Sequence, residues 1–295
     1  DYRSVFYLKM TRAFTKSIWI QAFSRMAKSK LTITALVVVI GYSLIALLAH
    51  WGILANDWQL EIGNSYEAPN IHHWFGTDIF GRSVFAKIVK STEVAMNVGF
   101  VVSIIAITIG VVLGAIGGYF GGVVDELIVW IYSTLAAIPN IMLLISLTFI
   151  LGKGILAIYI ALGMTNWVEI CRLIRGEVIR QKDREYVQAA TAIGASSFSK
   201  LALHILPNVM HIVIIQFSAI FQSAIKSEVI LSYLGLGIQN GPSWGVMIND
   251  AKVELMQGAW WQLIFSTMAM FLIVLAFNIL SDALRDALDP KLRGK

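Results

Sequence analysis

The chain has 295 residues, of which 57% are hydrophobic and only 14% are charged, and its mean hydropathy is +0.73. Because soluble domains carry about 25% charged residues, this composition excludes an ordinary soluble protein and indicates an integral membrane protein, whose long apolar segments predict an all-α fold. The net charge of +5 does not indicate nucleic-acid binding, since the Lys and Arg residues stand in short segments beside apolar runs. We therefore expect membrane lipid, and no nucleic acid, around this chain. The single cysteine, Cys171, excludes an internal disulfide and is expected to be a packed, unreactive thiol.

Six segments are long and apolar enough to cross a bilayer, which requires about 20 residues each. They are Leu31–Leu54, Val94–Tyr119, Leu127–Leu151, Ile155–Ile174, a segment that starts near Val209, and Trp260–Leu280. The chain then divides into an N-terminal segment (1–30), a first transmembrane helix (31–54), a polar loop (55–90), a core with five further transmembrane helices (91–282) and a tail (283–295). Within this core, residues 183–208 form a polar interruption.

The Lys and Arg residues are strongly asymmetric. Of the 23, 17 lie in the N-terminal segment, in the loop after the fourth crossing and in the tail. Six crossings place these three segments on one side, and the positive-inside rule makes that side cytoplasmic. We therefore predict cytoplasmic termini, with the loop 55–90 and a short interfacial helix near Val246–Met256 on the opposite side. Trp260 and Trp261 stand where an aromatic belt is expected.

The second crossing carries glycines at spacings of four. Gly110, Gly114, Gly118 and Gly122 share one helical face, which permits close approach of a neighbouring helix. Gly121 and Gly122 are expected to unwind the helix end, so that the face stops at Gly118. The pattern indicates either tight packing inside the subunit or a helix interface that slides during transport.

Two further features concern the third and fourth crossings. Pro139 removes a helical hydrogen bond and predicts a kink, where Asn140 either satisfies the freed carbonyl or faces a water-filled path. In the fourth crossing, Glu169 and Arg172 are spaced to form an ion pair on one helix face.

The fifth crossing carries a polar stripe that consists of His211, Ser218, Gln222 and Lys226. Polar stripes in lipid face protein or water, because a charge near the bilayer centre is costly. The stripe indicates a permanent contact with a partner subunit, a Lys226 that reaches the outer interface, or a wall of a solute pathway. Ser218, Gln222 and Lys226 are our candidates for pathway-lining residues.

The segment 183–208 reads as a helical hairpin between two crossings. Asp183 is a plausible N-cap, Gly194 a helix stop, and Ser196 or Ser197 a second N-cap. The second helix is expected to end before Pro207. Such a hairpin is either a docking element or a solvated connection.

This segment resembles the "EAA" loop of bacterial ABC-importer permeases, in which EAA is followed by Gly and Ile-x-Leu-Pro. The matching residues are Gln188-Ala189-Ala190, Gly194 and His204-Ile205-Leu206-Pro207. The resemblance implies coupling helices that insert into an ATPase subunit, with Tyr186, Gln188, Ala189, Ala190, Gly194, Leu206 and Pro207 at the joint. Because Gln188 replaces the Glu of the family, we expect docking by shape rather than by that charge.

Four further motifs are similar to the C-type permease subunit of dipeptide, oligopeptide and nickel importers. They are HWFGTDIFGRSVF (73–85), GGYFGGVVDELI (117–128), SYLGLGIQNGPSWGVMI (232–248) and NILSDALRDALDPKLR (278–293). The resemblance implies a type I permease fold and a multi-pass subunit of a bacterial inner membrane, which forms half of a pathway for peptides, or alternatively for nickel or other peptide-like cargo. It further implies four partners: a homologous B-type permease, two ABC ATPases and an extracytoplasmic solute-binding protein. No cofactor is expected on this chain, since ATP and Mg belong to the ATPases.

An intramembrane enzyme is the rival hypothesis. The chain contains neither HExxH nor a P-loop. His72 and His73 adjoin in a loop, where polar surface is the simpler explanation, and Ser223 with Lys226 is the only pairing that resembles a Ser/Lys dyad. A passive channel would leave the hairpin unexplained. We therefore predict no catalytic residue and no metal site.

Overall fold

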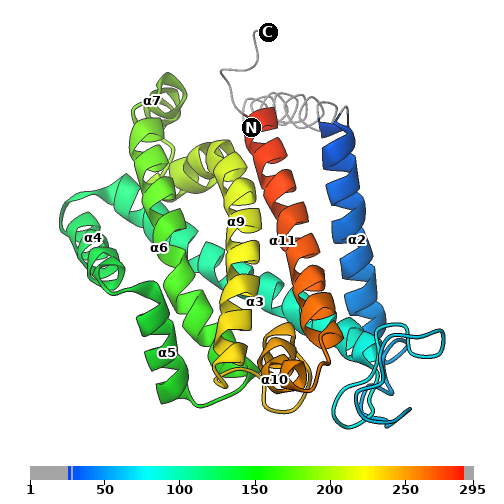
Figure 1. Ribbon diagram of the computed structural model, residues 1–295. Coiled ribbons are helices and arrows are strands. Elements are labelled where there is room, and N and C mark those ends of the chain that lie inside the picture. The colour runs from blue at the N-terminus through cyan, green and yellow to red at the C-terminus, as the bar shows by residue number, and fades with distance from the viewer. Residues whose placement is uncertain (1–25, 28, 289–295) are drawn as a thin grey trace.

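The computed structural model describes residues 26, 27 and 29–288, and its regular elements in that part of the chain are all helical (Figure 1). In chain order they are α2 (Lys30–His50), α3 (Val84–Phe120), α4 (Gly122–Ala137), α5 (Asn140–Leu151), α6 (Ile155–Lys182), α7 (Glu185–Ala192), α8 (Ser197–Ser199), the π-helix η1 (Lys200–Ile205), α9 (Leu206–Tyr233), α10 (Trp244–Met256) and α11 (Trp261–Leu288). Five spans are long and apolar enough to cross a membrane, or six if the bent pair α4–α5 counts as one. This agrees with the six predicted crossings.

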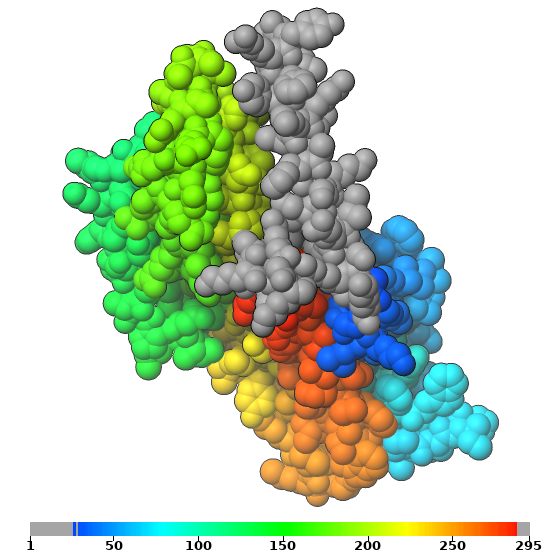
Figure 2. Space-filling view, turned by 90° about the horizontal axis from the view of Figure 1, so that it is seen from above, coloured from blue at the N-terminus to red at the C-terminus, as the bar shows by residue number. Residues whose placement is uncertain are grey.

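The described ends of the chain and the hairpin lie at the same end of the molecule. In Figure 1 the start of α2, the end of α11 and α7 are at the top, whereas α10 and the loop between α2 and α3 are at the bottom. Seen from the hairpin end, the light-green hairpin lies to one side of the red end of α11 (Figure 2). Most of the basic residues of the N-terminal segment (1–30) and of the tail (283–295) lie outside the described residues, so their shared side stays a prediction; the helices that lead to them, α2 and α11, have those ends on the side of the hairpin.

Helix α3 is longer than predicted and begins ten residues before Val94. The loop therefore ends at Ser83, whose hydroxyl accepts a hydrogen bond from the Ala86 amide at 3.2 Å and caps the helix. The prediction that residues 84–90 belong to the loop is wrong because Lys87, although charged, is buried in this helix. Its ammonium lies 2.9 Å from Asp78, a carboxylate with no exposure to solvent.

The glycine face of α3 packs against α6. A Cβ added to Gly110 would lie 2.8 Å from the Trp167 carbonyl oxygen, and one added to Gly114 would lie 2.6 Å from that of Cys171. A Cβ on Gly118 would lie 2.7 Å from the Arg175 carbonyl oxygen. The face stops there, as predicted, since α3 ends at Phe120 and Gly121 has a φ of +67°. Close packing inside the subunit is therefore the role that these glycines have in this structure, and Cys171 is buried as expected.

The third crossing is broken rather than kinked. Helices α4 and α5 meet at 95°, with Pro139 immediately before α5. Asn140 is exposed at the first position of α5. Proline cannot continue the hydrogen-bond ladder of α4, and its preceding residue, Ile138, is extended at ψ 132°. The expected kink thus underestimates the change of direction.

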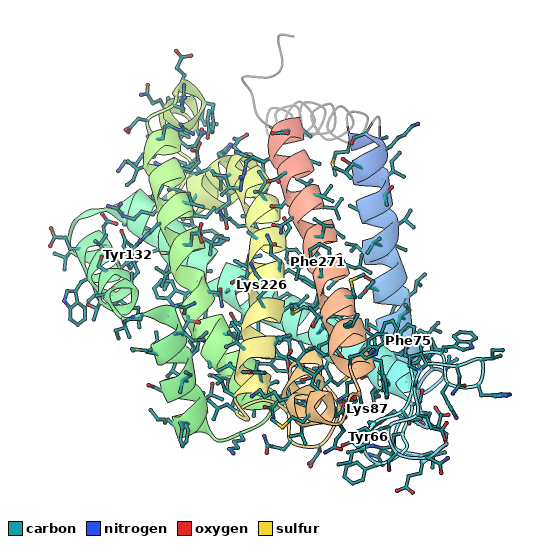
Figure 3. All side chains as sticks on the ribbon, viewed as in Figure 1. Tyr66, Phe75, Lys87, Tyr132, Lys226 and Phe271 are labelled. Atoms are coloured by element: carbon teal, nitrogen blue, oxygen red, sulfur yellow. The ribbon has the colours of Figure 1, made fainter. Side chains whose placement is uncertain are left out.

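Helix α4 is attached to α6 by two arginines. Arg175 binds both carboxylate oxygens of Asp125, with Nη2 2.6 Å from Oδ2. Arg172 of α6 lies over the ring of Tyr132, 4.8 Å from its centroid. Tyr132 is labelled on α4, at the left of Figure 3. The predicted ion pair between Glu169 and Arg172 is not among the contacts of the described residues, because Arg172 turns to this aromatic ring.

A cap closes the end opposite the hairpin. We use this name for residues 51–83 together with α10. Helix α10 begins two residues before the predicted short helix and ends at the same residue, so that prediction is confirmed. Trp261 joins the two parts, since its indole N–H donates to the Thr77 carbonyl at 2.9 Å and its side chain is buried. Trp261 is therefore not at a lipid interface as predicted, whereas Trp260 is 47% exposed.

Candidate functional site

The first candidate site is the surface hairpin, residues 183–208, which stands on the projecting end of α6. Helix α6 continues eight residues past the predicted end at Ile174 and stops at Lys182. Asp183 is the C-cap of α6, not the N-cap of α7 as predicted; that position belongs to Arg184. The hairpin is thus carried away from the transmembrane body by a continuous helix.

The turn of the hairpin is built as its sequence predicts. Gly194 has a φ of +82°, and its amide donates to the Thr191 carbonyl at 3.0 Å. The Ala195 amide donates to the Ala190 carbonyl at 3.0 Å, which completes a Schellman motif. Ser196 then caps α8 by accepting a hydrogen bond from the Ser199 amide at 3.2 Å.

The second arm of the hairpin does not end before Pro207. Residues 197–233 are continuously helical, because the π-helix η1 absorbs the proline. In this wider turn the Leu206 amide donates to the Leu201 carbonyl, five residues back, and Pro207 occupies the first turn of α9, where its missing N–H costs little. The side-chain amide of Asn208 donates to the His204 carbonyl at 2.7 Å.

The predicted coupling residues divide between two faces. Val187 and Ala190 are buried, and Tyr186 is half-buried, so these side chains hold the hairpin together. Gln188 and Ala189 are exposed. Gly194 and Pro207 are exposed, and Leu206 is half-buried. Only part of the predicted set is therefore available to a partner.

The exposed face of the hairpin also carries large apolar side chains that the sequence analysis missed. Ile193 is 78% exposed, Phe198 79% and Leu203 62%. Ile193 and Phe198 flank the Gly194 turn, and an apolar residue on each side of a polar turn is the signal that could have identified them. Apolar side chains exposed in a cluster are typical of protein interaction sites.

A hydrogen-bond chain fixes the first arm of the hairpin to α6. The Tyr186 hydroxyl donates to Gln181 Oε1 at 2.9 Å, and the Gln181 amide donates to Glu177 Oε1 at 2.7 Å. Arg180 pairs with the same Glu177 carboxylate. Burial raises the pKa of Tyr186 above its ordinary value, so its hydroxyl stays protonated as the donor. These hydrogen bonds fix α7 to α6, so we expect the two helices to move together.

Gln188 has a hydrogen bond that a glutamate could not form. Its side-chain amide donates to the Asp183 carbonyl at 3.1 Å. An ionised glutamate is an acceptor only. With Gln188 in place of the Glu of the resembled motif, this hydrogen bond ties the end of α6 to the first turn of α7.

The second candidate site is the uncovered face of α9, which we define by the exposed Lys226. Only some residues of the predicted polar stripe lie on this face. Ser218 is 4% exposed and donates to the Ile215 carbonyl of its own helix, so it lines no pathway in this structure. Lys226 is exposed, partway along α9 in Figure 3. Gln222, one turn away, is half-buried, and its Oε1 has no hydrogen-bond partner in the described structure. His211 is half-buried near the hairpin end and contacts the Asn208 carbonyl.

Within residues 26–288, apart from residue 28, there is no group of His, Cys, Asp and Glu that could hold a metal ion. His73 instead lies 3.3 Å from Glu67 in the cap. No hydrogen bond joins Ser223 to Lys226 in the described part of the chain, so these two side chains are not paired in this structure.

Comparison with known proteins agrees with this arrangement of helices. Residues 94–294 match the family model described as "Binding-protein-dependent transport system inner membrane component". The dipeptide transport system permease protein DppC of Bacillus subtilis (strain 168) is 36% identical over 282 residues, which cover 95% of this chain and 87% of that protein. The oligopeptide transport system permease protein OppC of the same strain is 34% identical, and the glutathione transport system permease protein GsiD of Shigella flexneri serotype 5b is 37% identical. Each of these two alignments covers 94% of this chain and 91% of the relative. The chain therefore belongs to the family of binding-protein-dependent transport system inner membrane components and is a C-type ABC-importer permease.

Proposed function

We propose that this chain forms one half of the translocation pathway of an ATP-driven peptide importer. The relatives are named for dipeptide, oligopeptide and glutathione transport, which favours peptides over nickel as the cargo. The other half of the pathway would come from a homologous B-type permease. Two ATPase subunits would supply ATP and Mg, and an extracytoplasmic solute-binding protein would deliver the peptide.

The observation that carries this proposal is the exposed apolar surface at the tip of the hairpin. Ile193, Phe198 and the small Ala189 are all exposed, and the hairpin that carries them lies at the end where α2 begins and α11 ends, beside the predicted basic segments. The positive-inside rule makes that end cytoplasmic, which is the compartment of ATP. A cleft on an ATPase subunit would cover these side chains and remove their apolar surface from water.

Movement of the hairpin would reach the transmembrane helices through both of its arms. The first arm is tied to α6 by the chain Tyr186–Gln181–Glu177, and the second continues into α9 without a break. ATP binding can shift the permease only if the ATPase contacts the hairpin more favourably in one state than in the other. The ATPase would therefore set the position of the hairpin, and the hairpin would move α6 and α9 with it.

The test is to replace Phe198 with aspartate, which puts a charge into the proposed contact without disturbing the buried side of the hairpin. We expect co-purification of the ATPase subunits with the tagged permease to fall at least tenfold, since burial of an unpaired charge costs several kcal/mol. The matched control is Met256→Asp, which alters a side chain that is 84% exposed at the opposite end. Undiminished ATPase recovery with Phe198→Asp would refute the docking role.

A further inference from the structure

Lys226 has no charged partner among the described residues, whereas two lysines of α3 are paired; Lys252 of α10 also lacks an ion pair, but its ammonium lies over the Tyr233 ring and binds Asn249. In α3, Lys87 lies 2.9 Å from Asp78 and Lys90 lies 2.6 Å from Glu93. Lys226 forms no ion pair with any residue that the structure describes, and its side chain is exposed. A lysine that lies inside an apolar span and lacks a partner in its own chain must face water, a ligand or another protein, because a bare ammonium in lipid is costly.

The position of Lys226 on α9 points it away from the packed body of the subunit. Phe221 marks the packed side, since its ring stacks on Phe277 of α11 at 4.1 Å and fills the space beside Gly99 of α3. Lys226 follows five residues later, about 140° further around the axis at 3.6 residues per turn. It lies seven residues from Tyr233, so about 10 Å inside the end of α9 nearest the cap.

The neighbours of Lys226 toward the hairpin are small or polar, whereas the exposed Ile230 lies one turn away toward the cap. Ser223 and Gln222 lie one turn away, and Ala219 lies one turn beyond them. The side-chain oxygen of Gln222 is buried and has no hydrogen-bond partner in the described structure, and the same amide group carries two N–H donors. An ammonium and an amide one turn apart suit a carboxylate, and no acidic side chain of α9 shares this face, since Glu228 is fully buried and bound to Ser232.

We propose that Lys226, assisted by Gln222, binds the C-terminal carboxylate of the peptide as it passes along α9. This inference rests on the proposed function. Lys226 would attract the carboxylate end of a peptide and repel its ammonium end, so it would favour one orientation of the cargo in the pathway. Amidation of the peptide C-terminus would remove the group that Lys226 recognises.

The test uses the complete importer in proteoliposomes and compares uptake of trialanine with uptake of trialanine amide. We expect Lys226→Met to lower trialanine uptake about tenfold, the effect of losing one charge-assisted hydrogen bond, and to leave amide uptake unchanged. Lys226→Arg should restore most of the trialanine uptake. Lys153→Met, which removes an exposed lysine from the loop between α5 and α6, is the matched control and should resemble wild type.

Three results would overturn or redirect the inference. Equal loss for both peptides would show that Lys226 contacts the partner permease, and no loss for either would show that it binds no cargo. If wild type carries neither peptide, the proposed function itself fails and this inference falls with it.

A second measurement decides the case in which the solute-binding protein rejects the amide. Lys226→Cys should react with an anionic, water-soluble methanethiosulfonate, and trialanine should slow this reaction at least threefold during turnover. Wild type, whose Cys171 is fully buried, is the unlabelled control. Failure of the variant to react, or reaction that trialanine does not slow, would refute the site.

Discussion

Replacing Gly114 with alanine tests how closely α3 and α6 pack. The added Cβ would lie 2.6 Å from the Cys171 carbonyl oxygen and 3.1 Å from the Arg175 amide nitrogen. Both are backbone atoms, so no side-chain rotation can relieve the contact. The two helices would have to separate or slide along each other over the whole length of the glycine face.

The expected cost follows from two opposing effects. Overpacking of a well-packed interface costs about 1–3 kcal/mol, whereas alanine in place of glycine favours the helix by about 1 kcal/mol. We expect Gly114→Ala to lower the free energy of unfolding by about 1 kcal/mol, and Gly114→Val to lower it further because a β-branched side chain reaches more of the same backbone.

The assay is denaturant unfolding of the purified permease in detergent micelles, with Gly41→Ala as the matched control. Gly41 lies in the transmembrane helix α2, and a Cβ there would meet nothing within 4 Å. Only the helix propensity changes at that position, so the control should be as stable as wild type or more stable. Equal stability of Gly114→Ala and Gly41→Ala would refute the close contact between α3 and α6.

Two further predictions concern the cap. Lys87→Met should lower the free energy of unfolding by about 2–3 kcal/mol, because the buried Asp78 carboxylate loses one of its two cationic partners and keeps only Arg82. In the same denaturant assay, adding Asp78→Asn should recover part of the loss, and no recovery would contradict the charge argument. Burial raises the pKa of Glu254 in α10 from 4.5 to about 7. The folded protein therefore keeps a proton that the unfolded chain releases as pH rises from 4.5 to 7, and stability falls across that window. Glu254→Gln should be about 3 kcal/mol more stable than wild type at pH 8 and equal to it at pH 4; thermal unfolding that shows the same difference at both pH values would contradict this assignment.

Hydropathy predicted the number of crossings correctly but misplaced several helix ends. The reason is that hydropathy reports contact with lipid, whereas a helix continues as long as its backbone and side chains find partners. The predicted second crossing began at Val94, after the charged Lys87, Lys90 and Glu93, yet Lys87 lies inside α3, where it is paired with Asp78. Beyond Ile174, α6 is held by contacts such as Gln181 to Glu177 that no hydropathy profile contains.

The hairpin shows which parts of a site local chemistry can predict. Gly194 and Ser196 were identified correctly because a left-handed turn and an N-cap each depend on one residue type. Pro207 was misinterpreted as a stop, since the π-helix that accommodates it depends on the packing of buried neighbours such as Leu201 and Ile205. The exposure of Ile193 and Phe198 likewise depends on which face of the hairpin packs, which the sequence pattern does not specify.

The close contacts of the glycine face limit how the helices of the permease can move. A helix that slid along α3 would drive the α6 backbone over Cβ atoms and ridges, but the spacing at Gly110, Gly114 and Gly118 leaves room for hydrogen atoms only. Helix α6 is also tied to α7, and the second arm of the hairpin runs unbroken into α9, which carries Lys226. A force on the hairpin would therefore turn α3, α6 and α9 together, and the Lys226 face would change its exposure by movement of this subunit against a partner rather than by rearrangement within the chain.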